Sequence, residues 1–172
     1  VNNASLVFDQ TSDASFAGAI SGTATEPGTY KFIVRGYSPV HLNHSESPVQ
    51  TIVVRQIPYF TETTLGPTAP ISIPYSDSVS ATGYPAPTYS TTGNFPPGLT
   101  VNPTTGAVTG APTVPGSYTF SIVATNVAGT ATTSPYTVIV SQAPIPVDDR
   151  ISPAILRNEP FTDTLTYTAY PA

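Results

Sequence analysis

Residues 108–124, VTGAPTVPGSYTFSIVA, contain the pattern that decides the fold. After the Pro-Gly pair in this stretch, Tyr118, Phe120 and Ile122 fall on one side of an extended chain, and the intervening Thr and Ser fall on the other. This period of two is typical of a half-buried β-strand. Upstream, residues 102–106, NPTTG, predict a tight turn between two short apolar runs. The pattern therefore predicts antiparallel strands joined by short turns.

The longer stretch 94–126, NFPPGLTVNPTTGAVTGAPTVPGSYTFSIVATN, combines the motifs PPGL, TGxVxG and PGxYxF. It resembles the immunoglobulin-like repeat of bacterial and archaeal surface proteins, which is related to cadherin-like dystroglycan modules. The resemblance implies a seven-stranded sandwich that occurs in tandem on secreted proteins, and it implies no chemistry by itself. Tyr30 and Tyr118 resemble the tyrosine corner of sandwich folds, which has a packing role.

Composition limits the class of protein. Only 9% of the 172 residues are charged, and 20 prolines and 12 glycines accompany a hydrophobic content of 39%. No stretch has helical periodicity, so we predict an all-β chain. The net charge of -5 argues against nucleic-acid binding, which needs a basic face. No apolar run is long enough for membrane insertion, and the absence of cysteine fits an exported protein without disulfides.

The sequence contains an internal repeat, and its first residues match the second half of that repeat. Residues 20–34 repeat the pattern of 108–122, and residues 161–172, FTDTLTYTAYPA, repeat 75–86, YSDSVSATGYPA. We therefore predict tandem immunoglobulin-like antiparallel β-sandwiches in which the flanking domain is split into complementary halves. The predicted units are the C-terminal half of a repeat at 1–58, a complete sandwich at 59–144, and the N-terminal strands of a further repeat at 145–172. The first and last residues fall at the same phase of the repeat.

The two partial repeats predict a strand-exchange interface. Residues 1–58 would expose unpaired strand edges, which recruit strands from elsewhere. Residues 145–172 would supply them, from the same chain or from a neighbouring chain, and a linear array favours the neighbour. Burying four apolar side chains would contribute roughly 6 to 12 kcal/mol. These predicted interface residues are Ile151, Phe161, Leu165 and Tyr167.

Metal-type ligands gather in two places. His41 and His44 lie three positions apart on a strand connection, but no third firm ligand stands beside them. Asp148 and Asp149 follow an inter-repeat linker and resemble the calcium sites at the junctions of cadherin-like arrays. The matching linker at residues 57–60 has no carboxylate. We predict that the protein needs no cofactor, with calcium as the alternative.

Other candidate sites are modifications and sugar contacts. Asn3 and Asn43 begin Asn-x-Ser sequons and are candidates for glycosylation. Tyr37, Tyr59 and Tyr89 are predicted to be exposed, where aromatic rings stack on sugars. No spacing places a nucleophile beside a histidine and a carboxylate, so we predict that the protein is not an enzyme.

These features predict an extracellular structural protein, a subunit of a cell-surface filament or stalk that assembles head to tail by β-strand complementation. Its partner is then another copy of itself, with surface glycans as a further candidate. Two alternatives remain open. The chain could be a segment of a long covalent array of such repeats in an adhesin, or it could be a carbohydrate-binding or spacer module of a secreted enzyme.

Overall fold

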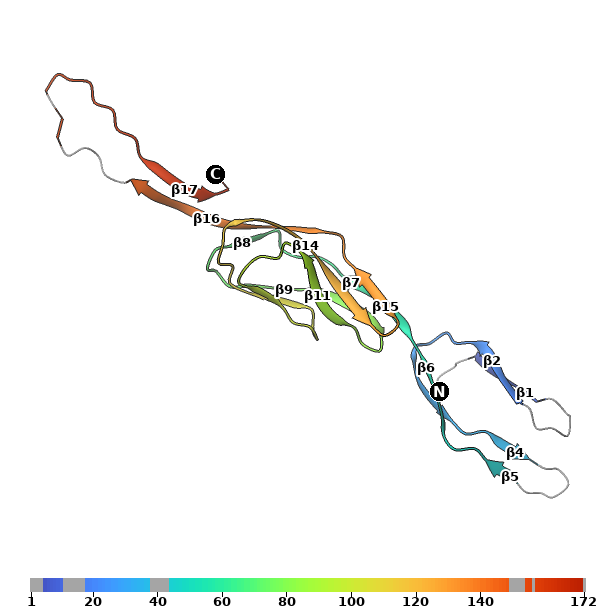
Figure 1. Cartoon of the computed structure of the whole chain (residues 1–172). Coiled ribbons are helices and arrows are strands. Elements are labelled where there is room, and N and C mark those ends of the chain that lie inside the picture. The colour runs from blue at the N-terminus through green and yellow to red at the C-terminus, as the bar shows by residue number, and fades with distance from the viewer. Residues whose placement is uncertain (1–4, 11–17, 38–43, 149–153, 156, 172) are drawn as a thin grey trace.

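The computed structural model describes residues 5–10, 18–37, 44–148, 154–155 and 157–171. These residues form strands and turns and contain no helix, which confirms the predicted all-β class. Figure 1 shows an elongated chain, in which a sandwich at residues 56–141, the central sandwich, lies between two thinner parts. We name these parts the leading segment, residues 5–55, and the trailing segment, residues 142–171.

The leading segment contains three antiparallel strand pairs, which belong to two hairpins. The first joins β1 (Ser5–Gln10) to β2 (Gly18–Thr23), the second joins β3 (Gly28–Phe32) to β6 (Gln50–Val54), and the third joins β4 (Arg35–Tyr37) to β5 (His44–Glu46). Each is a separate two-stranded antiparallel pair among the described residues.

The central sandwich has two main sheets. The first has β11 (Thr88–Gly93), β14 (Gly116–Asn126) and β16 (Tyr136–Asp148) in order, with β15 (Gly129–Thr132) on β14 and β8 (Thr68–Pro70) parallel to β16. The second has β12 (Leu99–Val101), β13 (Ala107–Gly110) and β9 (Tyr75–Ser78) in order. A further antiparallel pair joins β7 (Gln56–Glu62) to β10 (Ser80–Tyr84). In the trailing segment, β17 (Thr166–Tyr170) pairs with the far half of β16.

The core of the central sandwich contains the side chains that the period of two predicted. Tyr118, Phe120 and Ile122 are buried and Thr119 is exposed, whereas Ser121 is buried as well. The ring of Phe120 meets the ring of Phe95 edge to face, with centroids 4.7 Å apart. The buried core cluster comprises Leu65, Ala69, Val79, Tyr89, Leu99, Val108, Phe120, Ile122, Ala124 and Val138.

The predicted turn at residues 102–106 is present and has a local cause. The side-chain oxygen of Asn102 accepts hydrogen bonds from the backbone N–H groups of Thr104 at 2.9 Å and Thr105 at 3.1 Å. Gly106 then takes a φ of 73°, a left-handed conformation that favours glycine. This turn directs the chain from β12 into β13.

Candidate functional site

The leading segment has the strand register of one part of the central sandwich. In β3 and β6, Gly28 lies opposite Val54 and Phe32 lies opposite Gln50. In β14 and β16, Gly116 lies opposite Val140 and Phe120 lies opposite Tyr136. The β3 residues therefore match β14 residues 88 positions later, and the β6 residues match β16 residues 86 positions later.

A tyrosine hydroxyl makes the same hydrogen bond in both places. The hydroxyl of Tyr30 donates to the carbonyl of Glu26 at 2.8 Å, and the hydroxyl of Tyr118 donates to the carbonyl of Val114 at 3.0 Å. Each bond ties the strand to the residue four positions earlier, just before the Pro-Gly turn. Both tyrosines thus make the same hydrogen bond at matching positions of the repeat.

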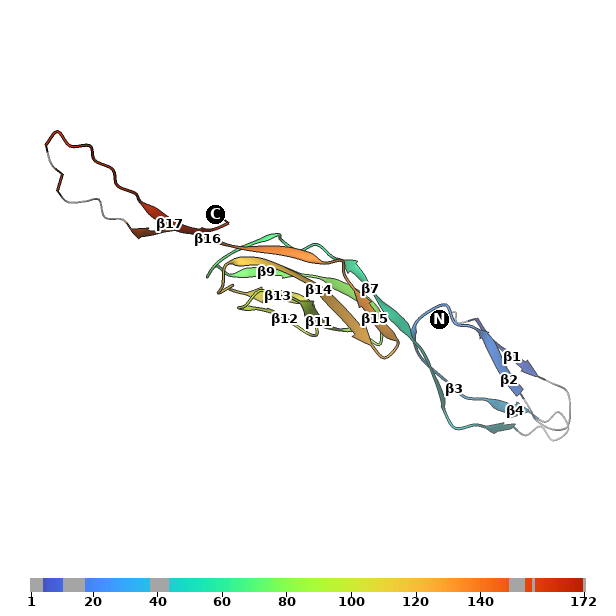
Figure 2. The ribbon, with the colours of Figure 1, turned by 45° about the horizontal axis from the view of Figure 1, so that its top comes forward.

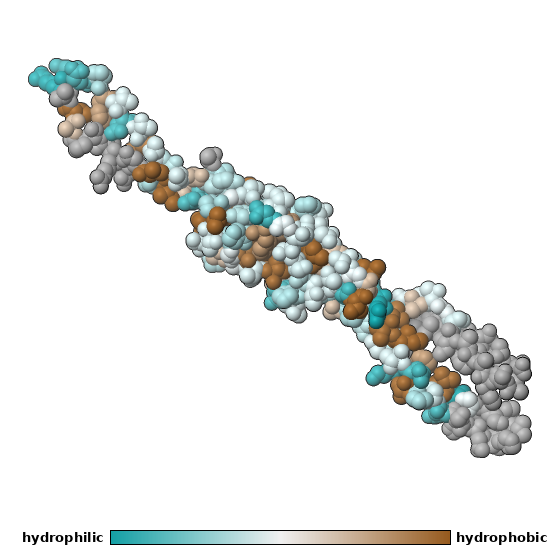
Figure 3. Space-filling view, in the orientation of Figure 1, coloured by the Kyte–Doolittle hydropathy of each residue, from teal (hydrophilic) through white to brown (hydrophobic). Residues whose placement is uncertain are grey.

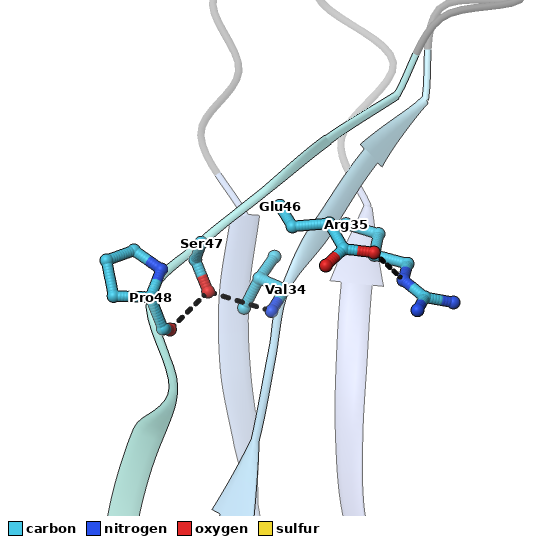
Figure 4. Close-up of polar contacts among 5 residues, drawn as sticks. All are labelled: Val34, Arg35, Glu46, Ser47 and Pro48. Carbon is cyan, nitrogen blue, oxygen red and sulfur yellow. Dashed lines mark hydrogen bonds and ion pairs between the residues drawn. The ribbon is translucent and has the colours of Figure 1, made fainter.

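A hydroxyl also repairs the same interruption in both hairpins. The Ser47 hydroxyl accepts a hydrogen bond from the Val34 N–H at 2.9 Å and donates to the Pro48 carbonyl at 2.8 Å (Figure 4). In the central sandwich, the Thr133 hydroxyl accepts from the Ile122 N–H at 3.0 Å. Each residue pair keeps a backbone hydrogen bond in the other direction, from the Ser47 N–H to the Val34 carbonyl at 2.8 Å and from the Thr133 N–H to the Ile122 carbonyl at 3.0 Å. The hydroxyl supplies the missing acceptor.

The salt bridge next to this site contributes little. Arg35 and Glu46 approach to 2.7 Å across β4 and β5 (Figure 4), but both side chains are well exposed. Exposed ion pairs are worth about 0 to 1 kcal/mol because water screens the charges.

The trailing segment has the register of the complementary part of the central sandwich. Gln142 lies opposite Tyr170 in β16 and β17, as Gln56 lies opposite Tyr84 in β7 and β10. The two register shifts along the pair also occur at matching positions, 86 residues apart. The side chain of Asp163 accepts from the N–H of the next residue at 2.8 Å, as Asp77 does.

Core positions of the repeat are exposed in the trailing segment. Ile155 is 65% exposed, whereas Ala69, 86 positions earlier, is 1% exposed. Leu165 is 44% exposed, whereas its counterpart Val79 is 0% exposed. Figure 3 shows hydrophobic surface on both thin parts of the molecule. No side chain described in either flanking segment is buried, from residues 21–36 and 46–55 or from 143–147, 154–155 and 157–171.

Two strand edges lack the partners that their counterparts have. In the central sandwich, β8 lies along β16 and β9 lies along β13. In the leading segment, β6 and β2 correspond to β16 and β13, and the pairings described for them are with β3 and β1 alone. Figures 1 and 2 show the trailing segment at the opposite end of the central sandwich from these edges.

Of the predicted interface residues, Phe161 and Leu165 lie in the extended run before β17, and Tyr167 lies in β17 opposite Pro146. All three are exposed. The candidate residues that lie outside the described residues are Ile151, Asp149, His41, Asn3 and Asn43. For His44 and Asp148, the description covers the strand backbone only.

The described part of the chain has neither a cluster of metal ligands nor a membrane-spanning helix. That part contains no group of three or more His, Cys, Asp or Glu side chains arranged to hold a metal ion. No helix capable of crossing a membrane was found among the same residues.

An aromatic-lined hollow of about 360 Å³ lies beside β7 and the start of β16. Tyr59, Phe60 and Tyr136 contribute to its wall, and the Tyr136 hydroxyl oxygen is buried without a hydrogen-bond partner in the structure. Burial raises the pKa of this hydroxyl. Tyr59 is exposed, as predicted.

The prediction that Tyr89 is exposed was wrong. Its ring belongs to the core, and its hydroxyl accepts from the Ala81 N–H at 2.8 Å and donates to the Ala81 carbonyl at 3.2 Å. Tyr89 alternates with the exposed Thr88 and Ser90 on β11, which places it on the inner face. The side chain of Tyr37 lies outside the described residues.

The end of the central sandwich that adjoins the leading segment has contacts that the sequence did not predict. The amide nitrogen of Asn126 donates to the carbonyls of Gln56 at 2.9 Å and Pro85 at 2.7 Å. The Thr29 and Tyr84 hydroxyls are 2.6 Å apart. Such contacts join residues far apart in sequence, and the only available signal was the Asn-x-x-Gly turn at 126–129.

Two packed, mainly antiparallel sheets, the tyrosine-corner hydrogen bonds and a core between the sheets define the class as an immunoglobulin-like sandwich. Residues 50–141 match the family described as "Putative Ig domain". The match spans more than half of the chain, and the chain belongs to this family. Domains of this family are structural or adhesion-type repeats typical of extracellular proteins, and immunoglobulin-like folds are generally non-catalytic.

Three solved structures are similar to parts of the chain. The chain is similar to Sidekick-1 immunoglobulin domains 1–5, with 18% identity and a TM-score of 0.51, over 76% of this chain and 29% of that one. A chimeric titin Z1Z2 matches with 24% identity and a TM-score of 0.43, and the match covers 52% of this chain and 98% of that one. A "putative alpha-galactosidase" from Bacteroides fragilis matches with 22% identity and a TM-score of 0.41, and the match covers 48% of this chain and only 17% of that one. No curated protein matches the chain.

Proposed function

We propose that the protein is a structural subunit of an extracellular filament or stalk. In this proposal, residues 145–172 of one copy supply the N-terminal strands of a sandwich, and residues 1–58 of the next copy supply its C-terminal half. One observation carries the proposal: the two flanking segments have the registers of complementary parts of the central sandwich. Head-to-tail pairing of different surfaces propagates in one direction and gives a filament.

The exposed core positions supply the driving force. Burying an Ile or Leu side chain contributes about 1.5 to 3 kcal/mol, and Ile155 and Leu165 are both largely exposed in the single chain. Their counterparts Ala69 and Val79 show that a completed sandwich buries these positions. Family membership supports the extracellular location.

The test compares assembly of two variants by light scattering and electron microscopy. Leu165→Asp places a charge at a core position, and we expect it to raise the concentration needed for assembly at least about tenfold, because each 1.4 kcal/mol is a factor of ten. Val147→Asp is the matched control, since Val147 is 66% exposed and its counterpart Thr61 is exposed in the central sandwich too.

Neither change touches the core of the central sandwich, so its thermal unfolding should be the same in both variants. Assembly of Leu165→Asp at the wild-type concentration would contradict strand complementation. A wild-type chain that remains monomeric at every concentration would contradict the filament itself.

A second candidate function is glycan binding at the aromatic-lined hollow. The exposed ring of Tyr59 in the wall of the hollow favours it, because sugars offer an apolar face on which an aromatic ring can stack. Binding to a glycan array that Tyr59→Ala abolishes, with unchanged filament assembly, would establish this function. Equal binding by the wild type and the variant would exclude this site.

A further inference from the structure

We propose the register of the strand exchange, an inference that rests on the proposed function. Residues 161–164 of one copy pair antiparallel with β2 of the next copy. Residues 154–155 of the same donor pair parallel with β6. The donor thereby joins the two separate hairpins of the leading segment, β1–β2 and β3–β6, into one sandwich.

The antiparallel register follows from β9 and β13. In the central sandwich, Tyr75 lies opposite Gly110, and Ser78 lies opposite Ala107. β2 occupies the place of β13, because Leu6 lies opposite Gly22 as Leu99 lies opposite Gly110. Adding 86 to the residue numbers of β9 and subtracting 88 from those of β13 gives the proposed pairs. They are Phe161 with Gly22, Thr162 with Ser21, Asp163 with Ile20, and Thr164 with Ala19.

The parallel register follows from β8 and β16. Thr68 lies opposite Ile139, and Ala69 lies opposite Val140. Adding 86 to the residue numbers of β8 and subtracting 86 from those of β16 places Ala154 opposite Val53 and Ile155 opposite Val54. In this register Ile155 takes the place of Ala69, which is almost completely buried.

The pairing needs the donor to cross between two sheets. In the central sandwich the chain makes this crossing between the end of β8 at Pro70 and the start of β9 at Tyr75. The donor has the same length of chain between Ile155 and Phe161 as the central sandwich has between Ala69 and Tyr75. Binding therefore joins both hairpins at once, and neither pairing alone closes the core.

The occupant of the two edges is a second copy of this chain. Its segment carries apolar residues at the positions that the repeat buries, Ile155 and Leu165, at the spacing of Ala69 and Val79. Figures 1 and 2 show the central sandwich between a chain's own donor and its own edges. A donor from the same chain would have to pass this sandwich.

Cysteine pairs test the register, because the sequence contains no cysteine. Ser21→Cys with Thr162→Cys places one thiol on each side of a directly opposite pair, and both positions are exposed. Opposite residues of antiparallel strands have Cα atoms about 4.5 to 5.5 Å apart, within the range of a disulfide. Ser21→Cys with Thr164→Cys is the matched control, since diagonal neighbours lie about 7 to 8 Å apart.

The readout is a denaturing gel without reductant after mild oxidation of the full chain. We expect a ladder of dimers, trimers and larger species for the 21/162 pair, at least about tenfold stronger than for the 21/164 pair. A second pair, Val53→Cys with Ala154→Cys, should give a similar ladder, because adjacent strands lie about 4.8 Å apart.

The outcomes separate this inference from the proposed function. A ladder from the 21/164 pair in place of the 21/162 pair would overturn the register while head-to-tail assembly stands. A fast-migrating monomer with an internal disulfide would overturn the second copy as donor. Loss of both ladders together with loss of assembly in the cysteine-free chain would overturn the proposed function as well.

Discussion

The Thr133 hydroxyl makes one contact whose removal has a calculable cost. It lies where β15 ends and β16 has not begun, so β14 has no ladder acceptor opposite Ile122. The hydroxyl accepts the Ile122 N–H at 3.0 Å, and Ile122 is 0% exposed. Thr133→Val keeps a side chain of similar shape and removes the acceptor.

The cost follows from burial. A buried donor left without a partner costs about 1 to 3 kcal/mol, since it gives up water without gaining a protein acceptor. For a domain of this size, each kcal/mol lowers the melting temperature by about 4 to 8 °C. We therefore expect Thr133→Val to lower the Tm of the central sandwich by at least about 4 °C.

The assay is thermal unfolding followed by near-ultraviolet circular dichroism of the buried tyrosines. Thr132→Val is the control, because Thr132 is exposed on β15 one residue earlier and should change stability by less than about 0.5 kcal/mol. Thr133→Ser keeps a hydroxyl and should recover most of the loss. If Thr133→Val and Thr132→Val melt at the same temperature, the proposed role of the hydroxyl is wrong.

Three further predictions address the central sandwich. Gly106→Ala should destabilise it by at least about 1 kcal/mol in urea unfolding, because the left-handed backbone disfavours a Cβ and the Val79 carbonyl blocks it; unchanged stability would contradict this. Burial and a neighbouring carboxylate raise the pKa of Tyr75 to about 12 from 10.0, so stability should fall as pH rises from about 10 to about 12. The unfolded state ionises first in this window, and Tyr75→Phe should remove that part of the pH dependence. Asn126→Ala removes four side-chain hydrogen bonds within the central sandwich, to the Gln56 and Pro85 carbonyls and from the Ala128 and Gly129 N–H groups. It should lower the melting temperature of the sandwich, and an unchanged melting temperature would contradict this.

The sequence alone could propose the interface residues because each copy of the repeat has the same strand pattern. Phe161 and Leu165 were identified by aligning two copies of one motif, which needs no knowledge of contacts. Strand register could not be predicted in this way, because it depends on which edges meet and where the ladder shifts. Only the pairings of β7 with β10 and of β16 with β17 revealed identical shifts at matching positions.

Local chemistry decided other features before any tertiary contact. The Asn102 turn and the alternation of Tyr118, Phe120 and Ile122 depend on neighbours in the chain, so they could be predicted correctly. The burial of Tyr89 could not, since a tyrosine suits either face of a half-buried strand and its partner is the backbone of Ala81 on another strand.

The sequence by itself determined an all-β immunoglobulin-like repeat and its turns. These properties are periodic or local, and each can be read from a few adjacent residues. Only the tertiary structure decided that the Ser47 and Thr133 hydroxyls repair equivalent strand breaks, and that Ile155 and Leu165 are exposed where Ala69 and Val79 are buried. Burial and cross-strand hydrogen bonds depend on which segments meet in space, and distance along the chain does not specify that.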